Sequence, residues 1–349
     1  MMKYTQNSIN ILTALQFKGI GRSWIVTNWR RDLSDEQIVT MINNSSKDKK
    51  ITINDFDVER IDVLNRISTQ EQYADGIVGF LDEEFPFCRG NAKKGDRPVV
   101  LFYKGDIKLL DSNYSSVAVI GVLKPEEGVE QRERKMVSAL LKYNYVIVSG
   151  LAFGCDSIAH KQTLEDKGKT VAILPSPLSN IVPSQHKELA EKIVQLGGLL
   201  VTEYFEDPKS QMEMRGRYQE RDRLQAMFSD AIILTASYDV NSDGNDSGSR
   251  LAMEYARQYQ IPRYIMYNEV IDGNNPQFDL NRRLLHEGES QMLKQGMISF
   301  IGSDIHHDEE LHTEKLYKEL KKYVKKDELV KDLLENNFDK VINNELIEK

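Results

Sequence analysis

The sequence predicts an α/β fold built on a doubly wound, mostly parallel β-sheet. From residue 117 onward, short apolar runs rich in β-branched residues alternate with helical patterns. Strands separated by single helices favour a parallel sheet with helices on both faces. The strands are expected at 117–121, 145–149, 170–174, 198–202, 231–236 and 263–267, and the helices at 128–143, 156–167, 184–196, 219–228 and 248–260.

The segments on either side of this pattern differ from it. Residues 9–30 carry apolar residues at helical spacing around Gly19-Ile20-Gly21, which is typical of a helix–hairpin–helix module that either binds a phosphate or only packs. Residues 76–110 are extended, with a strand at 99–103. After 300 the chain becomes highly charged and amphipathic, as in a docked helical tail or a partner-binding helix. We therefore expect a helical module over 1–70, an α/β domain over 71–300 and a helical tail over 301–349.

Composition excludes several classes of protein. The 349 residues carry a net charge of −8, which argues weakly against a surface coated in positive charge but leaves room for a local basic groove. No apolar run approaches the roughly 18 residues of a membrane span, and the N-terminus lacks the apolar core of a signal peptide. The only cysteines, Cys88 and Cys155, cannot form a disulfide framework or a cysteine-rich metal site. We expect a cytoplasmic protein with no membrane contact, no metal and no cofactor.

The first candidate site is the stretch from Val146 to His160. Its order is strand, glycine loop and helix start, with Gly150 and Gly154 in the loop. Free backbone N–H groups at a helix start attract anions, and glycines let a phosphate come close. The alternative is a plain strand-to-helix turn, because the spacing matches neither a dinucleotide fingerprint nor a Walker A loop.

The second candidate is an arginine-rich stretch between Met214 and Leu224. Arginine forks match phosphate oxygens, and an adjacent aromatic side chain offers a stacking face for a base. The alternative is a solvated helix face whose arginines pair with neighbouring acidic residues. The predicted nucleic-acid contacts in this stretch are Arg215, Gly216, Arg217, Tyr218, Arg221 and Arg223.

A third candidate, Ser247-Gly248-Ser249, follows the strand expected at 231–236 and opens the next helix. Ser249 suits an N-cap, and small hydroxyl groups beside free N–H groups form another anion site. Asp156 and His160 are four residues apart on one helix and could hydrogen-bond. No nucleophile or acid–base constellation stands out, so no catalytic residue is predicted.

The order and spacing of these motifs resemble the DNA-processing protein A (DprA/Smf) family. The resemblance runs from about residue 10 to residue 290. Arg221-Asp-Arg223 is similar to the family's R-N-R element, and Ser247-Gly-Ser249 is similar to its S-G-S element. It further rests on Gly19-Ile-Gly21, Phe85-Pro86, Val99 to Asp106, Val117 to Gly121, Ser149 to Asp156 with Ala159-His160, and Gly168 to Leu174.

This resemblance implies an extended Rossmann fold that binds and protects single-stranded DNA, helps load a RecA-type recombinase and forms a homodimer. It implies that Arg215 contacts a phosphate and that Tyr218 contacts a base. The family's G-S-R element is Gly121-Val122-Leu123 here, with Lys124 as a partial substitute for the arginine. The chain therefore looks like a divergent member, serving natural transformation or a specialised mobile-element or defence role.

Two other classes of function remain open from the residues. Related (SLOG-like) Rossmann folds bind or hydrolyse nucleotide-derived small molecules, although their P-G-G-x-G-T-x-x-E element is replaced here by residues 247–254. The second open class is a scaffold protein whose binding site is vestigial. We expect a binding protein rather than an enzyme, with a nucleotide phosphoribohydrolase as the runner-up.

Overall fold

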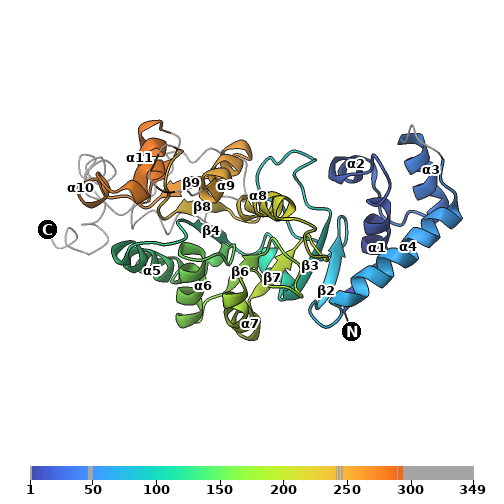
Figure 1. Ribbon diagram of the computed structural model, residues 1–349, viewed down its shortest axis with the longest axis horizontal. Coiled ribbons are helices and arrows are strands. Elements are labelled where there is room, and N and C mark those ends of the chain that lie inside the picture. Colours follow the sequence, from blue (N-terminus) through green and yellow to red (C-terminus); the bar gives the residue numbers. More distant parts are fainter. Residues whose placement is uncertain are drawn as a thin grey trace, which may run out of the picture.

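A ten-stranded sheet runs through the residues that the structure, a computed structural model, describes: 2–45, 50–240, 242, 244, 247–288 and 290–293. Its order is β1-β2-β3-β7-β6-β5-β4-β8-β9-β10 (Figure 1). The strands are β1 (Lys3–Tyr4), β2 (Gly76–Gly79), β3 (Val100–Gly105), β4 (Ser116–Ile120), β5 (Val146–Ser149), β6 (Thr170–Ile173), β7 (Leu199–Thr202), β8 (Ala231–Leu234), β9 (Arg263–Ile265) and β10 (Gln291–Met292).

The sheet is mostly parallel, as predicted. All neighbours from β7 to β10 are parallel, and β1 is parallel to β2, whereas β3 runs antiparallel to both β2 and β7. The chain builds outward from β4 to β7 and then returns to place β8 on the other side of β4. This reversal creates a topological switch point between β4 and β8, where ligands of open α/β sheets bind.

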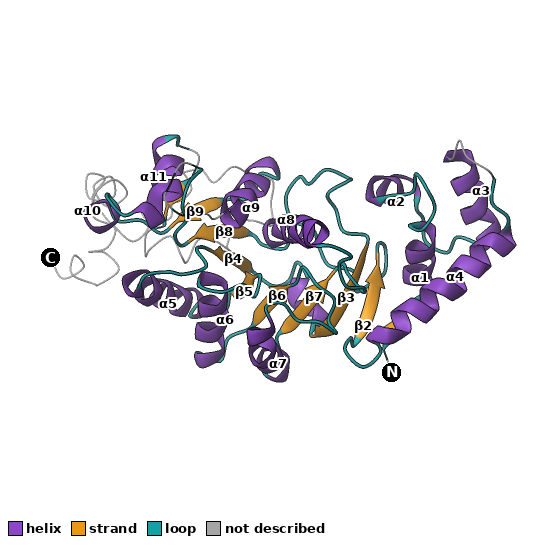
Figure 2. Ribbon diagram, viewed as in Figure 1, coloured by secondary structure: helices purple, strands orange, loops and turns teal. Residues whose placement is uncertain are grey.

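Helices cover both faces of the sheet, as Figure 2 shows. The sheet helices are α5 (Glu127–Leu141), α6 (Cys155–Glu165), α7 (Lys187–Gln195), α8 (Gln211–Met227), α9 (Ser247–Gln258), α10 (Glu269–Asp272) and α11 (Asp279–His286). The N-terminal module contains α1 (Gln6–Ala14), α2 (Arg22–Asn28), α3 (Asp35–Ser45) and α4 (Ile53–Ile67). Short 3₁₀ turns lie at Ser68–Gln70, Ile107–Leu110, Ser184–His186 and Pro276–Phe278.

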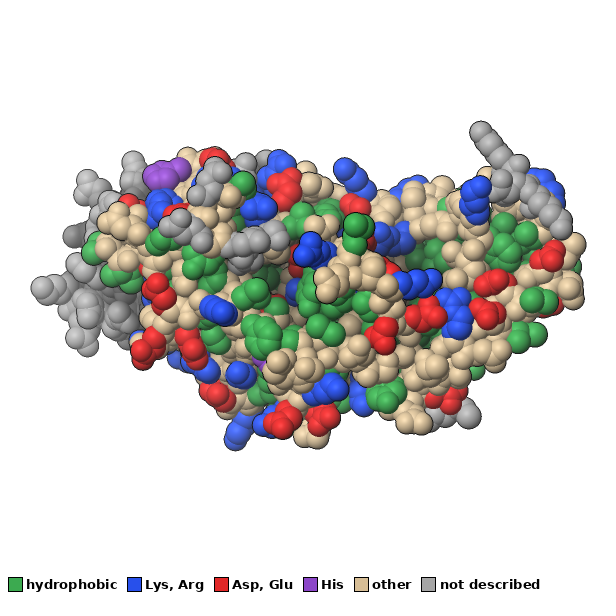
Figure 3. All heavy atoms as spheres, viewed as in Figure 1, with side chains coloured by type: hydrophobic (Ala, Val, Ile, Leu, Met, Phe, Trp, Pro, Cys, Tyr) green, Lys and Arg blue, Asp and Glu red, His purple; other side chains and the backbone are tan. Residues whose placement is uncertain are grey.

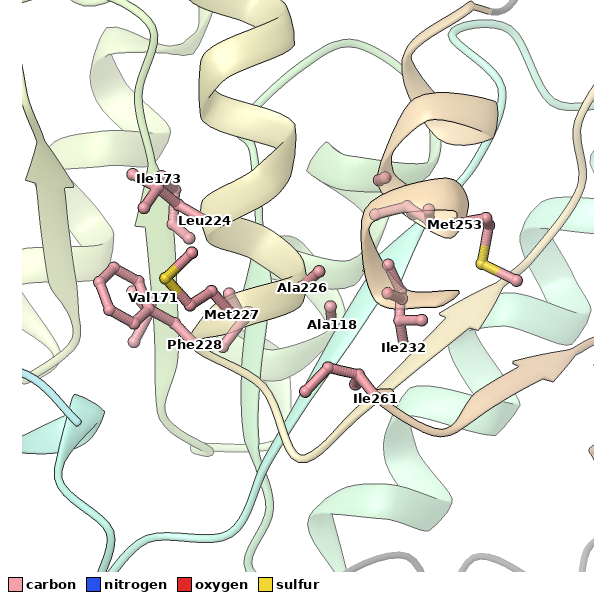
Figure 4. Packing of buried hydrophobic residues seen from close by; sticks show 14 of the residues in the cluster. Ala118, Val171, Ile173, Leu224, Ala226, Met227, Phe228, Ile232, Met253 and Ile261 are labelled. Carbon is pink, nitrogen blue, oxygen red and sulfur yellow. The ribbon is translucent and has the colours of Figure 1, made fainter. Parts of the chain in front are cut away.

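Alternating side chains of the central strands explain this two-sided cover. Along β4, Val117 and Val119 pack with Met136 of α5, whereas Ala118 belongs to the cluster that holds Leu224 of α8. Figure 4 shows the second cluster, with side chains of α8 and α9 pressed onto the sheet. Because both faces of these strands are buried, the sequence reads as continuous apolar runs rather than as alternation.

The helical module shares a hydrophobic core with the sheet. Ile11 of α1 and Phe56 of α4 belong to the same buried cluster as Phe102 of β3 and Leu200 of β7. In addition, β1 at the start of the chain pairs with β2 at the sheet edge. The helices flank Gly19-Ile20-Gly21 as expected, but a boundary near residue 70 does not separate two cores. The predicted tail over 301–349 lies outside the described residues.

One helix is longer than predicted. The helix expected from residue 219 begins at Gln211, because the Ser210 hydroxyl accepts a hydrogen bond from the Glu213 N–H (3.1 Å) and caps it. The whole arginine-rich stretch is therefore helical. No helix among the described residues is long and apolar enough to cross a membrane.

Candidate nucleic-acid interface

The predicted site segments converge at the switch point. The Ser249 hydroxyl at the start of α9 donates to the Gly121 carbonyl oxygen after β4 (3.2 Å). The loop after β5 packs against the same segment: Gly154 has φ 71°, and a Cβ there would lie 2.2 Å from the Val122 carbonyl oxygen. Glycine is required at this position by both the backbone conformation and the close approach. The loops after β4 and β5 and the start of α9 thus form one surface.

The glycine loop binds a carboxylate of the chain itself. Asp156 Oδ2 accepts hydrogen bonds from the N–H groups of Gly150 (3.2 Å) and Ala152 (3.3 Å) and from Arg221 Nη1 (3.3 Å). With its amide oxygen facing these donors, Gln225 accepts from Gly150 N (2.9 Å) and Arg221 Nη1 (3.1 Å). The Gly150 N–H group lies in the loop expected to hold a phosphate, but in the structure an aspartate at the helix start already accepts its hydrogen bond.

Arg221 is a buried structural cation rather than an exposed phosphate ligand. Its side chain is 7% exposed and also contacts Asp222 (Nε–Oδ1 3.2 Å). A Cβ at Gly150 would lie 1.1 Å from Arg221 Nη1, so the guanidinium is packed directly on the glycine loop. Burial, the largest influence, lowers the pKa of Arg221, but the carboxylates of Asp222 and Asp156 raise it above its ordinary value. Arg221 therefore stays charged and holds α8 onto the loop.

Arg217 is buried on the same helix. Its Nη2 lies 2.6 Å from Glu213, one turn earlier, and its Nη1 donates to the Glu206 carbonyl oxygen (2.6 Å). The guanidinium also stacks on Tyr204, 4.2 Å from the ring centroid. Both terminal nitrogens of the Arg217 guanidinium are therefore already paired within the protein. Direct phosphate contact by Arg217 is not supported.

Arg223 links α8 to the helical module. It is 1% exposed, its Nη2 lies 2.7 Å from Glu203, and its Nη1 donates to the Glu220 carbonyl oxygen (2.6 Å). Arg22, directly after the Gly19–Gly21 hairpin, pairs with the Glu220 carboxylate (2.6 Å). The acidic partners predicted as the alternative are real, but the arginines that they pair with are buried rather than spread over a solvated face.

Arg215, Gly216 and Tyr218 form the accessible part of the stretch. Arg215 is exposed, and its side chain has no partner among the described residues. A Cβ at Gly216 would meet nothing within 4 Å, so this helix surface is open. Tyr218 is half-buried, with the Arg221 guanidinium 5.8 Å from its ring centroid. Arg215 and Tyr218 are three residues apart and share one face of α8.

Three further predicted residues differ in accessibility. Lys124 is exposed on the loop after β4, while Gly248 is partly exposed in the first turn of α9. The Ser249 hydroxyl is buried and bonded to Gly121, so it braces the switch point instead of facing solvent. The side chain of Ser247 lies outside the description. The face shown in Figure 3 mixes basic and acidic side chains without a continuous basic area.

His160 pairs with Thr170 and not with Asp156. The Thr170 hydroxyl donates to the Ile147 carbonyl oxygen (2.7 Å), so it accepts from His160 Nδ1 (2.7 Å). Burial lowers the pKa of His160 to about 3, which keeps the ring neutral at pH 7. A buried histidine in this state is a packing residue, and no acid–base pair forms with Asp156.

Sequence reasoning missed two exposed apolar side chains at this surface. Leu123 follows β4 and is 50% exposed, while Phe153 follows β5 and is 44% exposed. A signal was present, since both residues lie within four positions of the end of a predicted strand, where loops reach the edge at which ligands bind in such sheets.

The fold and this surface define a Rossmann-type α/β protein with accessible side chains at its switch point. The chain belongs to the DNA recombination-mediator protein A family, whose model matches residues 76–295. Protein Smf of Borreliella burgdorferi is 33% identical over 140 residues, covering 40% of this chain and 43% of the relative. Protein Smf of Synechocystis is 30% identical over 203 residues, covering 58% and 48%. The chain therefore spans about half the length of the curated relatives it matches.

Solved structures support the same fold. DNA processing protein A from Streptococcus pneumoniae superposes with a TM-score of 0.65 at 22% identity, covering 89% of this chain and 100% of the relative. The protein of the same name from Helicobacter pylori superposes with a TM-score of 0.52 at 28% identity, covering 66% and 96%. That second protein is described as having a unique single-stranded DNA binding mode.

Proposed function

We propose that this protein binds single-stranded DNA across the switch-point edge, with Arg215 contacting a phosphate and Tyr218 stacking on a base. The observation that carries the proposal is an exposed arginine without a partner, one turn from a partly exposed tyrosine, on a helix held rigidly by buried ion pairs. Lys124 and Gly248 extend the accessible surface. The Helicobacter pylori relative, which is described as binding single-stranded DNA, supports this choice of ligand.

Arg217, Arg221 and Arg223 have a supporting part in this proposal. Arg221 and Arg223 hold α8 in place through the carboxylates of other segments, and Arg217 does so through the Glu206 carbonyl oxygen, so that the exposed residues face outward in a defined geometry. A pre-organised surface loses less entropy on binding. Nucleotide hydrolysis is less well supported, because the loop N–H groups expected to hold a phosphate already bind Asp156. We therefore propose a binding protein that uses no metal or cofactor.

Salt-dependent binding tests the proposal. Labelled oligo-dT should bind better than duplex DNA, and log K should fall with log salt by about 0.7 per phosphate contact. Arg215→Ala should weaken binding and reduce the slope by about one phosphate equivalent. Tyr218→Ala should cost roughly 1–3 kcal/mol with little change in slope.

Lys142→Ala is a control for overall charge. It removes one positive charge from an exposed position before β5, at the amino-terminal ends of the strands and so away from the proposed site. It should leave both affinity and slope close to parental values. A parental chain that binds duplex and single strands equally, or without salt dependence, contradicts the proposal.

Two partners follow from the proposed role. The family resemblance supports a RecA-type recombinase that receives the strand, and a homodimer that carries a continuous DNA path. We propose that the protein acts in the cytoplasm, where a recombinase would receive the strand. Light scattering at micromolar concentration should give twice the chain mass of 40.1 kDa, and a monomer mass would contradict dimerisation.

A further inference from the structure

Phe153 is a large apolar side chain left open at the binding edge. It is 44% exposed and lies in the loop between β5 and α6, where Gly150 packs on Arg221 of α8. We propose that Phe153 is a second base-stacking platform for single-stranded DNA, in addition to Tyr218. This inference rests on the proposed function and names a further contact of the same site.

The loop that carries Phe153 is fixed on both sides of the ring. Leu151 is fully buried and adopts φ 58°, and the Ala152 N–H is bonded to Asp156 (3.3 Å). On the other side, Gly154 lies so close to the Val122 carbonyl oxygen that a Cβ would be 2.2 Å away. Because the neighbouring backbone is locked, the ring is presented without a further ordering cost.

His186 fixes the direction of the ring. The His186 and Phe153 rings meet edge to face, with centroids 4.9 Å apart and planes at 62°. The imidazole itself is held because its Nδ1 donates to the Leu151 carbonyl oxygen (2.8 Å), an atom that can only accept. A side chain needed only for core packing would be covered, whereas Phe153 combines a fixed orientation with an open surface.

The surroundings favour a nucleobase over a phosphate as the occupant. An exposed neighbour on the adjacent loop is Leu123, whose carbonyl carbon lies 2.5 Å from where a Gly154 Cβ would be. Neither Phe153 nor Leu123 carries a charge, so these two side chains offer a phosphate no direct partner; the exposed Lys124 beside them is the group that suits the backbone. Aromatic rings stack on every base, which suits binding without sequence preference.

The buried ion pair connects the two platforms. Tyr218 lies beside Arg221, with 5.8 Å between the guanidinium and the ring centroid. Arg221 in turn packs on Gly150, three residues before Phe153. In this proposal, a strand with one base on Tyr218 runs toward Phe153 across the loop that the Asp156–Arg221 pair holds in place.

Substitution of Phe153 in the full-length chain tests the inference. Phe153→Ala should weaken oligo-dT binding by about 5- to 160-fold while leaving the salt slope unchanged, because a stacked base and not a phosphate contact is lost. Phe153→Trp should retain the affinity. Phe153→Leu keeps apolar cover over His186 but removes the aromatic face, so it should bind as weakly as the alanine variant.

Tyr143→Ala is the matched control. Tyr143 is 52% exposed and precedes β5, at the opposite end of the same strand from Phe153. This variant should bind like the parental chain. Thermal melting of every variant verifies folding, so that a loss of affinity reports the lost ring.

The outcomes separate the two proposals. A parental chain that does not bind oligo-dT overturns the proposed function and this inference together. A parental chain that binds, with Phe153→Ala or Phe153→Leu at parental affinity, overturns only the stacking role of Phe153. A reduced salt slope in Phe153→Ala also overturns it, since stacking releases no counterions.

Discussion

Replacing Arg221 with alanine should destabilise the fold. The guanidinium is shared by Asp156 at 3.3 Å and Asp222 at 3.2 Å, whose side chains are 8% and 4% exposed. Removing one partner of a buried pair costs about 3–5 kcal/mol, because a charge is left in a dry environment. A change of 1 kcal/mol shifts the melting temperature by roughly 2–4 °C in chains of 150–250 residues and by less in longer ones. We therefore expect a melting temperature lower by roughly 5–15 °C.

Thermal unfolding followed by circular dichroism measures this shift. Arg215→Ala is the matched control on the same helix: its side chain is exposed and should change stability by no more than about 0.5 kcal/mol, while weakening single-stranded DNA binding. The reasoning is refuted if Arg221→Ala melts with the parental chain yet loses DNA affinity. Arg221 would then contact DNA directly, and its internal pairing would be incidental.

Three other substitutions give sharp expectations. Gly150→Ala should lower the melting temperature, because the new Cβ would lie 1.1 Å from Arg221 Nη1, whose buried pairing resists displacement; an unchanged melting curve would contradict this packing. Burial raises the pKa of the Glu133 carboxyl well above its ordinary value of 4.5. The protonated carboxyl therefore contributes its full stability below pH 4.5, and this contribution is lost as the pH rises through the raised pKa of the folded state. Glu133→Gln should consequently melt above the parental chain at pH 8 and near it at pH 4, and equal differences at both pH values would count against the assignment. Leu123→Arg adds a charge at an exposed position after β4 and should steepen the salt slope for oligo-dT by about 0.7, whereas an unaltered slope would place the DNA path elsewhere.

The parallel strands could be predicted because their signal is local. Each is a short apolar run whose residues are buried on both faces, as Val117 and Ala118 show. The two-residue strands β1 and β10 carry no such pattern and depend on partners elsewhere in the sheet. The sequence predicts the start of α8 at residue 219, which is too late. The first two turns of the helix are mostly polar and contain Gly216, so no apolar periodicity marks them.

The arginine environment could not be predicted because its partners are distant in sequence. Arg221 meets Asp156 across 65 positions, and Arg223 meets Glu203 across 20. Sequence spacing shows that arginines cluster, but burial decides whether a guanidinium serves DNA or the fold. Among the four arginines of α8, Arg215 is the one whose predicted exposure agrees with the structure.

The common core of the helical module and the sheet limits how such a protein can evolve. Ile11 and Phe56 on one side, and Phe102 and Leu200 on the other, are almost completely buried against one cluster. Separating the chain near residue 70 would uncover apolar surface on both pieces and remove β1, leaving β2 as an open edge that invites pairing with other chains. Gene rearrangement cannot simply exchange the first 70 residues between relatives. Changes in the module and in β3 must be inherited together, so they should co-vary.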